Sequence, residues 1–116
     1  MRVIARSTLA RFVATLKGKR EQQSVEAALR SWFHEVARAK WKNAAEVKAA
    51  YASASIVDAE RVVFNMKGNN YRLVAAVNYE RQIVFIKWLG SYAEYDRIDV
   101  RTVQYGDQTY QRPSRS

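Results

Sequence analysis

Residues 90–99, GSYAEYDRID, carry two tyrosines, three carboxylates and one arginine within ten positions. The segment directly follows an apolar run, IVFIKWL at 83–89, so it stands where a strand is expected to end. Two interpretations are open. Such a segment is typical of a solvated helix start, and it is also typical of one wall of an active site.

Arginine, lysine, tyrosine and carboxylate side chains can support RNA cleavage through attack of the ribose 2′-hydroxyl. That reaction needs a group that accepts the 2′ proton, a cation that stabilises the charged phosphorane, and a group that protonates the leaving 5′ oxygen. Arginine and lysine can supply the positive charge. Tyrosine is the weaker acid or base, because its unperturbed pKa is about 10, and neighbouring cations would lower that pKa.

The sequence offers little to other kinds of site. It has no cysteine and a single histidine, His34, which disfavours a zinc site, a cysteine nucleophile and a Ser-His-Asp triad. Neither G-x-x-x-x-G-K-[ST] nor G-x-G-x-x-G is present. We therefore expect no metal and no cofactor, and a structural or exposed role for His34.

The chain is strongly basic, with a formal net charge of +9 that is spread over both halves. This excess indicates a polyanion as partner, with nucleic acid or the ribosome as the candidates; the alternative is a domain that happens to be basic. The absence of cysteine, of an apolar leader and of a span of roughly 20 apolar residues favours a cytoplasmic protein with no membrane partner.

The first half of the chain has helical periodicity. After a short strand at 2–5, Ser7 is expected to cap a first helix that ends near Gly18. A longer helix is expected over about 21–40, and a short one over 44–51 after a turn at Asn43. The apolar stripe of the long helix consists of Val25, Leu29, Trp32 and Val36.

The second half has strand character. Segments 60–66, 71–78 and 83–89 are rich in β-branched and aromatic residues and are separated by short turn signals, which predicts an antiparallel meander. Helices followed by a sheet predict an α+β fold, with the N-terminal strand and two-helix hairpin packed on one face of an antiparallel sheet. We expect one domain over 1–116, with a polar tail that frays from about residue 105.

Charged residues interrupt the predicted strands. Arg61, Arg72 and Lys87 lie in or at the edge of them, and desolvating such charges on the helix-packed face would be costly. We therefore expect them on the other, open face of the sheet, where Lys67 in the intervening turn would extend a cationic surface. The alternative is that they are ordinary polar residues of an open antiparallel sheet.

Residues 61–96 closely resemble the HigB toxins of bacterial type II toxin–antitoxin systems, within the RelE-like superfamily. The resemblance rests on FNMKGNNYRLVA at 64–75 and on EYD at 94–96, and it extends roughly over residues 1–99. It implies a compact α+β fold and an endoribonuclease that cuts mRNA on the translating ribosome without a metal. It also implies a cognate HigA-type helix-turn-helix antitoxin, through which the complex would bind operator DNA.

The resemblance also suggests catalytic residues. Arg72 and Lys87 are expected to bind phosphate and stabilise charge. Tyr92 is expected to act as acid or base or to stack on a base, and it stands where the family pattern THxEYD has a histidine and this chain reads SYAEYD. Tyr95 is either catalytic or structural. Sharing one phosphate requires Tyr92 to lie within about 12 Å of Arg72.

Further residues are expected to contact the substrate. They are Arg61, Asn65, Lys67, Glu94 and Asp96. Asn65 would position substrate, Glu94 would serve as a base or simply be exposed, and Asp96 would contact substrate or fix the segment after the last strand. Two further functions stay open: a basic domain that binds RNA or the ribosome without cutting, and an inactive toxin remnant that binds its antitoxin.

Overall fold

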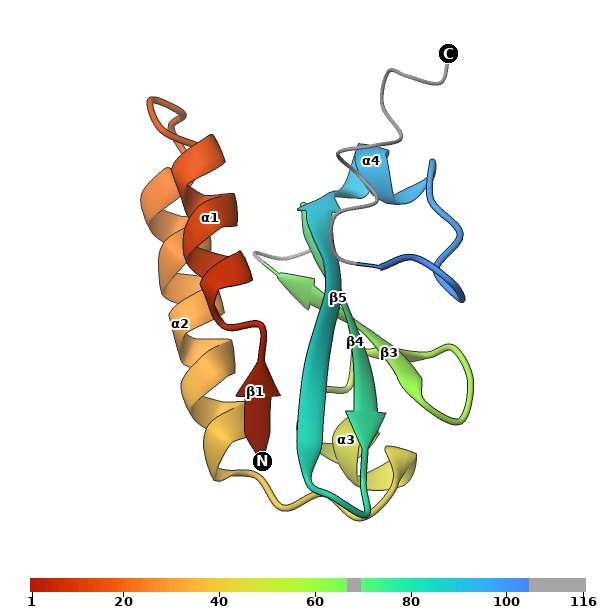
Figure 1. Cartoon of the computed structure of the whole chain (residues 1–116). Coiled ribbons are helices and arrows are strands. Elements are labelled where there is room, and N and C mark those ends of the chain that lie inside the picture. The colour runs from red at the N-terminus through yellow and green to blue at the C-terminus, as the bar shows by residue number, and fades with distance from the viewer. Residues whose placement is uncertain (67–69, 105–116) are drawn as a thin grey trace.

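The computed structural model describes residues 1–66 and 70–104 and has an α+β fold, as the sequence predicted (Figure 1). Helices come first along the chain, and most of the sheet follows. In order the elements are β1 (Arg2–Ile4), α1 (Ser7–Thr15), α2 (Gln22–Arg38), α3 (Ala44–Ala50), β2 (Ser55–Ile56), β3 (Arg61–Met66), β4 (Tyr71–Asn78), β5 (Ile83–Ser91) and α4 (Tyr92–Tyr95). The predicted polar tail from about residue 105 lies outside the described residues.

The sheet has five strands in the order β1-β5-β4-β3-β2. Strands β3, β4 and β5 form the predicted antiparallel meander. The N-terminal strand was expected on one face of the sheet with the helical hairpin, but β1 is an edge strand of the sheet and pairs in parallel with β5, with Arg2 opposite Ile83. A parallel pair needs a long connection between its strands, and here the chain passes through the elements from α1 to β4 before it returns as β5. The two-residue β2 was not predicted.

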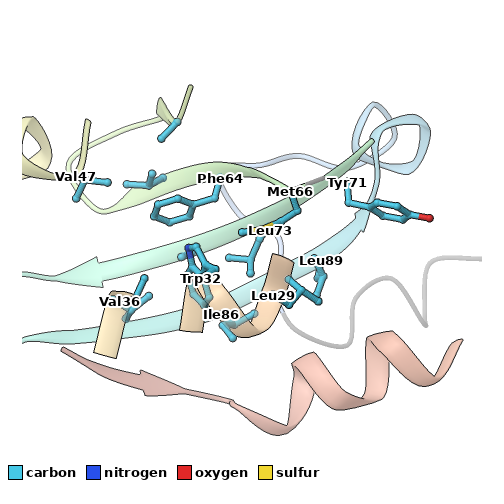
Figure 2. Packing of buried hydrophobic residues seen from close by; sticks show 14 of the residues in the cluster. Leu29, Trp32, Val36, Val47, Phe64, Met66, Tyr71, Leu73, Ile86 and Leu89 are labelled. Carbon is cyan, nitrogen blue, oxygen red and sulfur yellow. The ribbon is translucent and has the colours of Figure 1, made fainter. Parts of the chain in front are cut away.

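The long helix packs on one face of the sheet through the predicted stripe. Val25, Leu29, Trp32 and Val36 are all buried. The Trp32 ring meets Phe64 of β3 edge-on, with 5.4 Å between the ring centroids. Figure 2 shows this layer, in which residues of α2 lie against side chains of β3, β4 and β5. The helical hairpin and sheet therefore share one extensive hydrophobic core.

The helix ends agree with the sequence in part. Gly18 follows α1 with a φ of +85°, a conformation that glycine adopts most readily. Asn43 caps α3, since its Oδ1 accepts a hydrogen bond from the Glu46 N–H at 3.0 Å. Ser7 is not a cap: it is the first residue of α1, and Arg6 occupies the cap position with no side-chain hydrogen bond.

The second face of the sheet is not open, contrary to expectation. Val63, Val74 and Trp88 are buried there against Val103, which lies in the segment that follows α4. Residues 96–104 cross this face on the side of the sheet away from α1 and α2 (Figure 1). The central strands carry apolar residues on both faces, so the second face needs a cover as well. None of the described helices is long and apolar enough to span a membrane.

Candidate active site

The clearest concentration of functional groups is formed by one arginine and two tyrosines. Arg72 lies on β4 opposite Gly90 of β5, and α4 begins immediately after β5 ends. The Arg72 Cζ atom lies 4.7 Å from the ring centroid of Tyr92 and 5.1 Å from that of Tyr95. Both contacts have cation–π geometry. The prediction that Tyr92 lies within reach of Arg72 is therefore confirmed.

Arg72 and Tyr92 border an open pocket of about 550 Å³, at the end of the molecule where β4 begins and β5 ends. Its lining comes from three regions, namely Glu21 before α2, Asn70–Arg72, and Ser91–Ala93. Tyr92 is 50% exposed, and its backbone N–H donates to the Asn70 carbonyl at 2.9 Å. The pocket is thus accessible from solvent beside a fixed positive charge.

Two pocket residues were missed by the sequence analysis. The Tyr71 hydroxyl donates to Glu21 Oε2 at 2.7 Å. Burial, together with this hydrogen bond, raises the pKa of Tyr71 to about 12, so the phenol remains protonated well above neutral pH. Glu21 comes from the connection between α1 and α2, and no local pattern predicts that such a residue reaches β4.

Glu94 is exposed, as one of its two alternatives expected, and its side chain is also engaged by the backbone at the start of α4. Ser91 Oγ accepts from the Glu94 N–H at 3.1 Å, and Glu94 Oε1 accepts from the Ser91 N–H at 2.9 Å. The two residues form a capping box around the start of α4. The S-x-x-E signal of such a box is present in the sequence as SYAE at 91–94.

Gly90 lies inside β5, one residue before the strand ends. A Cβ atom at this position would meet Trp88 Cη2 at 2.5 Å and Glu94 Oε1 at 2.9 Å. Glycine is required here by the close approach of these two side chains. The indole of Trp88 and the carboxylate of Glu94 therefore fill the space above Gly90, directly across from Arg72.

Arg61 was expected on an exposed cationic surface, and this was wrong. The side chain is 7% exposed, and its Nη1 donates to the carbonyls of Val100 at 3.1 Å and Val103 at 2.7 Å. The covering segment 96–104 removes Arg61 from solvent while satisfying its donors. Arg61 thus holds that segment on the sheet and is not available to a substrate.

Lys87 is not brought next to the tyrosines. The pairing of β4 with β5 shifts at this point, with Val74 opposite Trp88 and Ala75 opposite Ile86, so Lys87 is the extra residue of a bulge. Its Nζ donates to Gln104 Oε1 at 3.1 Å. Lys87 precedes Gly90 by three positions, which corresponds to roughly 10 Å along a strand.

The remaining candidates have mixed positions. Asn65 pairs with Arg72 across the strands, but its Nδ2 donates to the Ser53 carbonyl at 3.0 Å, so it also holds the loop before β2. Asp96 is the exposed residue that ends α4. Lys67 lies outside the described residues.

The described residues give no support for a metal site. His34 is exposed on α2, where its ring lies beside that of Phe33. Within residues 1–66 and 70–104, no group of three or more histidine, cysteine, aspartate or glutamate side chains could hold a metal ion.

A helical hairpin on a five-stranded mixed sheet, with an arginine held by two tyrosines beside an open pocket, defines a small basic α+β protein with a site suited to an anion. Residues 25–98 match the family HigB_toxin, described as the RelE-like toxic component of a toxin–antitoxin system. The match covers more than half of the chain, so the protein belongs to this family. No curated protein gives a significant match to the sequence.

Membership in this family makes the chain the toxin of a toxin–antitoxin pair and implies an antitoxin as its partner. The resemblance found in the sequence is thereby confirmed. The contacts of Arg72 with Tyr92 and Tyr95 lie within the matched residues.

Proposed function

We propose that this toxin is an endoribonuclease that cleaves mRNA on the translating ribosome through attack of a ribose 2′-hydroxyl. The observation that carries the proposal is the guanidinium of Arg72, held against the rings of Tyr92 and Tyr95 at the edge of an open pocket. A planar, permanently charged group in this position suits a phosphate, whose oxygens it can contact in pairs.

In this mechanism Arg72 stabilises the extra negative charge of the phosphorane as it forms. Charge placed in advance where a transition state develops charge is usually the largest single contribution to catalysis. The hydroxyl of Tyr92 donates a proton to the leaving 5′ oxygen, while the 2′ proton passes to water. The products are a 2′,3′-cyclic phosphate and a free 5′-hydroxyl, and every group used belongs to the protein or the substrate.

The remaining basic residues act as binding groups in this proposal. Lys87 lies on β5, three positions before the residue opposite Arg72, which suits it to another phosphate of the same RNA strand rather than to the scissile one. The exposed face of Tyr92 offers a surface on which an unpaired base can stack. Tyr95 contacts Arg72 and also the Trp88 ring, with 6.3 Å between the centroids of the Tyr95 and Trp88 rings. Tyr95 therefore connects Arg72 to the buried Trp88.

We further propose a HigA-type helix-turn-helix antitoxin as the partner and contact with operator DNA through the complex alone. The family supports a partner of the antitoxin class. In the toxin itself, α1 and α2 use their apolar faces to cover the sheet, which leaves them unsuited to the role of a recognition helix.

The second candidate function is a toxin that occupies the ribosome without cutting mRNA. The feature that favours it is Tyr92, which replaces the histidine of the family pattern. Histidine is the usual acid or base near neutral pH, and a tyrosine in its place could leave binding intact while cleavage is lost.

The test is primer extension on programmed ribosomes treated with the wild type, Tyr92→Phe and Tyr92→Ala. A nuclease cuts the mRNA but leaves a message with a 2′-deoxy nucleotide at the cleavage site intact. Proton donation by Tyr92 predicts that both variants lose cleavage, whereas a purely stacking role predicts that Tyr92→Phe keeps it. Ribosome binding without any cut by the wild type would establish the non-cleaving function instead.

A further inference from the structure

The two tyrosines that contact Arg72 stand on a helix that cannot support itself. Helix α4 has four residues, Tyr92–Tyr95, and none of them is buried. A single turn pays the full cost of helix nucleation without the benefit of propagation. Its conformation must therefore be imposed by contacts with the rest of the fold, among them the packing of Tyr95 against Trp88 and the bonds at its first residue.

The capping box supplies these contacts from the strand side. Ser91 is at once the last residue of β5 and the cap of α4, and it exchanges two hydrogen bonds with Glu94. The Glu94 carboxylate also lies against Gly90, where an added Cβ would meet Oε1 at 2.9 Å. Glu94 thus ties α4 to the strand position that pairs with Arg72.

The positions of the two rings follow from this turn. Tyr92 and Tyr95 are three residues apart, and residues at this spacing share a helix face only while the turn is formed. Both rings lie within about 5 Å of Arg72, so unwinding α4 would take at least one of them away from the guanidinium. The capping box is therefore the element that joins Arg72 and the tyrosines in one arrangement.

We infer that Glu94 is a positioning residue: with Ser91 it fixes the turn that sets Tyr92 and Tyr95 against Arg72, and it takes no proton from the substrate. The inference rests on the proposed nuclease function. A glutamine can close a capping box through its amide oxygen but cannot act as a base. The substitution Glu94→Gln therefore distinguishes a positioning role from a role as base.

The experiment compares Glu94→Ala and Glu94→Gln in single-turnover cleavage on programmed ribosomes. Loss of the box in Glu94→Ala should lower the maximal rate by about tenfold with little change in the half-saturating toxin concentration. Glu94→Gln should stay within about twofold of the wild type. A Glu94→Gln variant as slow as Glu94→Ala would overturn the inference and make Glu94 a base.

A matched control lies at the other short helix. Glu46 closes the start of α3 in a similar way: its N–H donates to Oδ1 of the cap Asn43, and its Oε1 accepts at 2.8 Å from the N–H of Lys42, the residue before the cap. Glu46→Ala should lower the unfolding free energy about as much as Glu94→Ala while leaving the cleavage rate unchanged. A fall in rate with Glu46→Ala would mean that the effect at Glu94 is general destabilisation.

An NMR measurement separates this inference from the proposed function. The ring currents of Tyr92 and Tyr95 should shift the Arg72 Nε–H resonance, because both rings contact the guanidinium. Glu94→Ala should move this resonance towards the value of a solvated arginine, and Glu94→Gln should not. This result is expected even if the wild type fails to cut mRNA, in which case the nuclease proposal fails and the positioning role stands. An unmoved resonance in Glu94→Ala would refute the positioning role.

Discussion

The two faces of the sheet perform different tasks with the same strands. The face under α1 and α2 carries the apolar and aromatic side chains that pack into a continuous core. The second face has a smaller apolar cluster around Trp88 and also carries Arg61, Arg72 and Lys87. A charged residue on a strand therefore identifies the second face, but it does not identify an exposed site.

The two arginines of the second face show why. Arg61 is covered by residues 96–104 and bonded to the carbonyls of that segment. Arg72 lies near the pocket, where aromatic rings contact its guanidinium. An arginine thus stabilises the fold at position 61 and lines a pocket at position 72. The difference depends on whether the segment after β5 covers the guanidinium.

Trp32→Ala on the helix-covered face should have the largest effect on stability. The side chain is 1% exposed and packs on Phe64, so its removal leaves a cavity and should cost about 3–5 kcal/mol. Urea unfolding followed by circular dichroism measures this loss. A variant whose unfolding free energy falls by less than about 1 kcal/mol would contradict the assignment of the main core.

Arg61→Met should destabilise the protein by about 1–3 kcal/mol, because it leaves the carbonyls of Val100 and Val103 buried without a donor. Arg81→Met in the exposed turn between β4 and β5 is the matched control and should change stability by less than about 0.5 kcal/mol. Equal effects of the two substitutions, measured by urea unfolding, would remove the distinction drawn between buried and exposed arginines.

Gly90→Ala should cost about 1–3 kcal/mol through overpacking, since the new methyl group meets the Trp88 ring at 2.5 Å. The cost should be smaller in a Trp88→Phe background, which lacks the two indole atoms that come closest. Thermal unfolding of the four proteins in this cycle measures the coupling. Strictly additive effects would show that the ring does not set the requirement for glycine.

Tyr71→Phe should have the smallest effect in this series, and its effect should be present at neutral pH and disappear in strong alkali. The pKa of Tyr71 is raised to about 12 by burial and by its bond to Glu21, so the folded protein holds a proton that the unfolded chain loses near pH 10. The stability contributed by Tyr71 is complete below about pH 10 and is lost as the pH rises towards about 12.

Urea unfolding at a series of alkaline pH values checks this, and Tyr71→Phe should reduce the slope of the wild type. An unchanged slope would assign the alkaline loss to another group. Tyr51 is the alternative, because burial and its hydrogen bond to Glu35 also raise its pKa.

Much of the fold could be predicted from the sequence, since it depends on local patterns. The stripe of α2, the start of α3 after Asn43 and the three strands of the meander all follow from spacing and turn residues. The parallel pairing of β1 and the cover over the second face could not be predicted, because they join segments far apart in the chain. The same limit explains Arg61, whose partners lie about 40 positions away.

The pairing of Arg72 with Tyr92 in the candidate site could be predicted, whereas the positions of Glu21 and Lys87 could not. Arg72 and Tyr92 could be paired because β4 and the end of β5 are neighbours in a meander. The capping bond of Glu94 is indicated by the pattern S-x-x-E at 91–94. The hydrogen bond between Tyr71 and Glu21 depends on how the helical hairpin packs on the sheet, which no local pattern indicates. The bulge that sets Lys87 apart leaves no sequence signal that we recognise.

The most direct test of the account compares Arg72→Ala and Arg72→Lys with the wild type, measuring mRNA cleavage on programmed ribosomes and unfolding free energy on the same preparations. Arg72→Ala should cut at least about 100-fold more slowly while its unfolding free energy changes by about 1 kcal/mol or less. Arg72→Lys keeps the charge without the planar guanidinium and should fall between the two. Unimpaired cleavage by Arg72→Ala, or a loss that follows a collapse in stability, would show that this arginine, like Arg61, serves the fold.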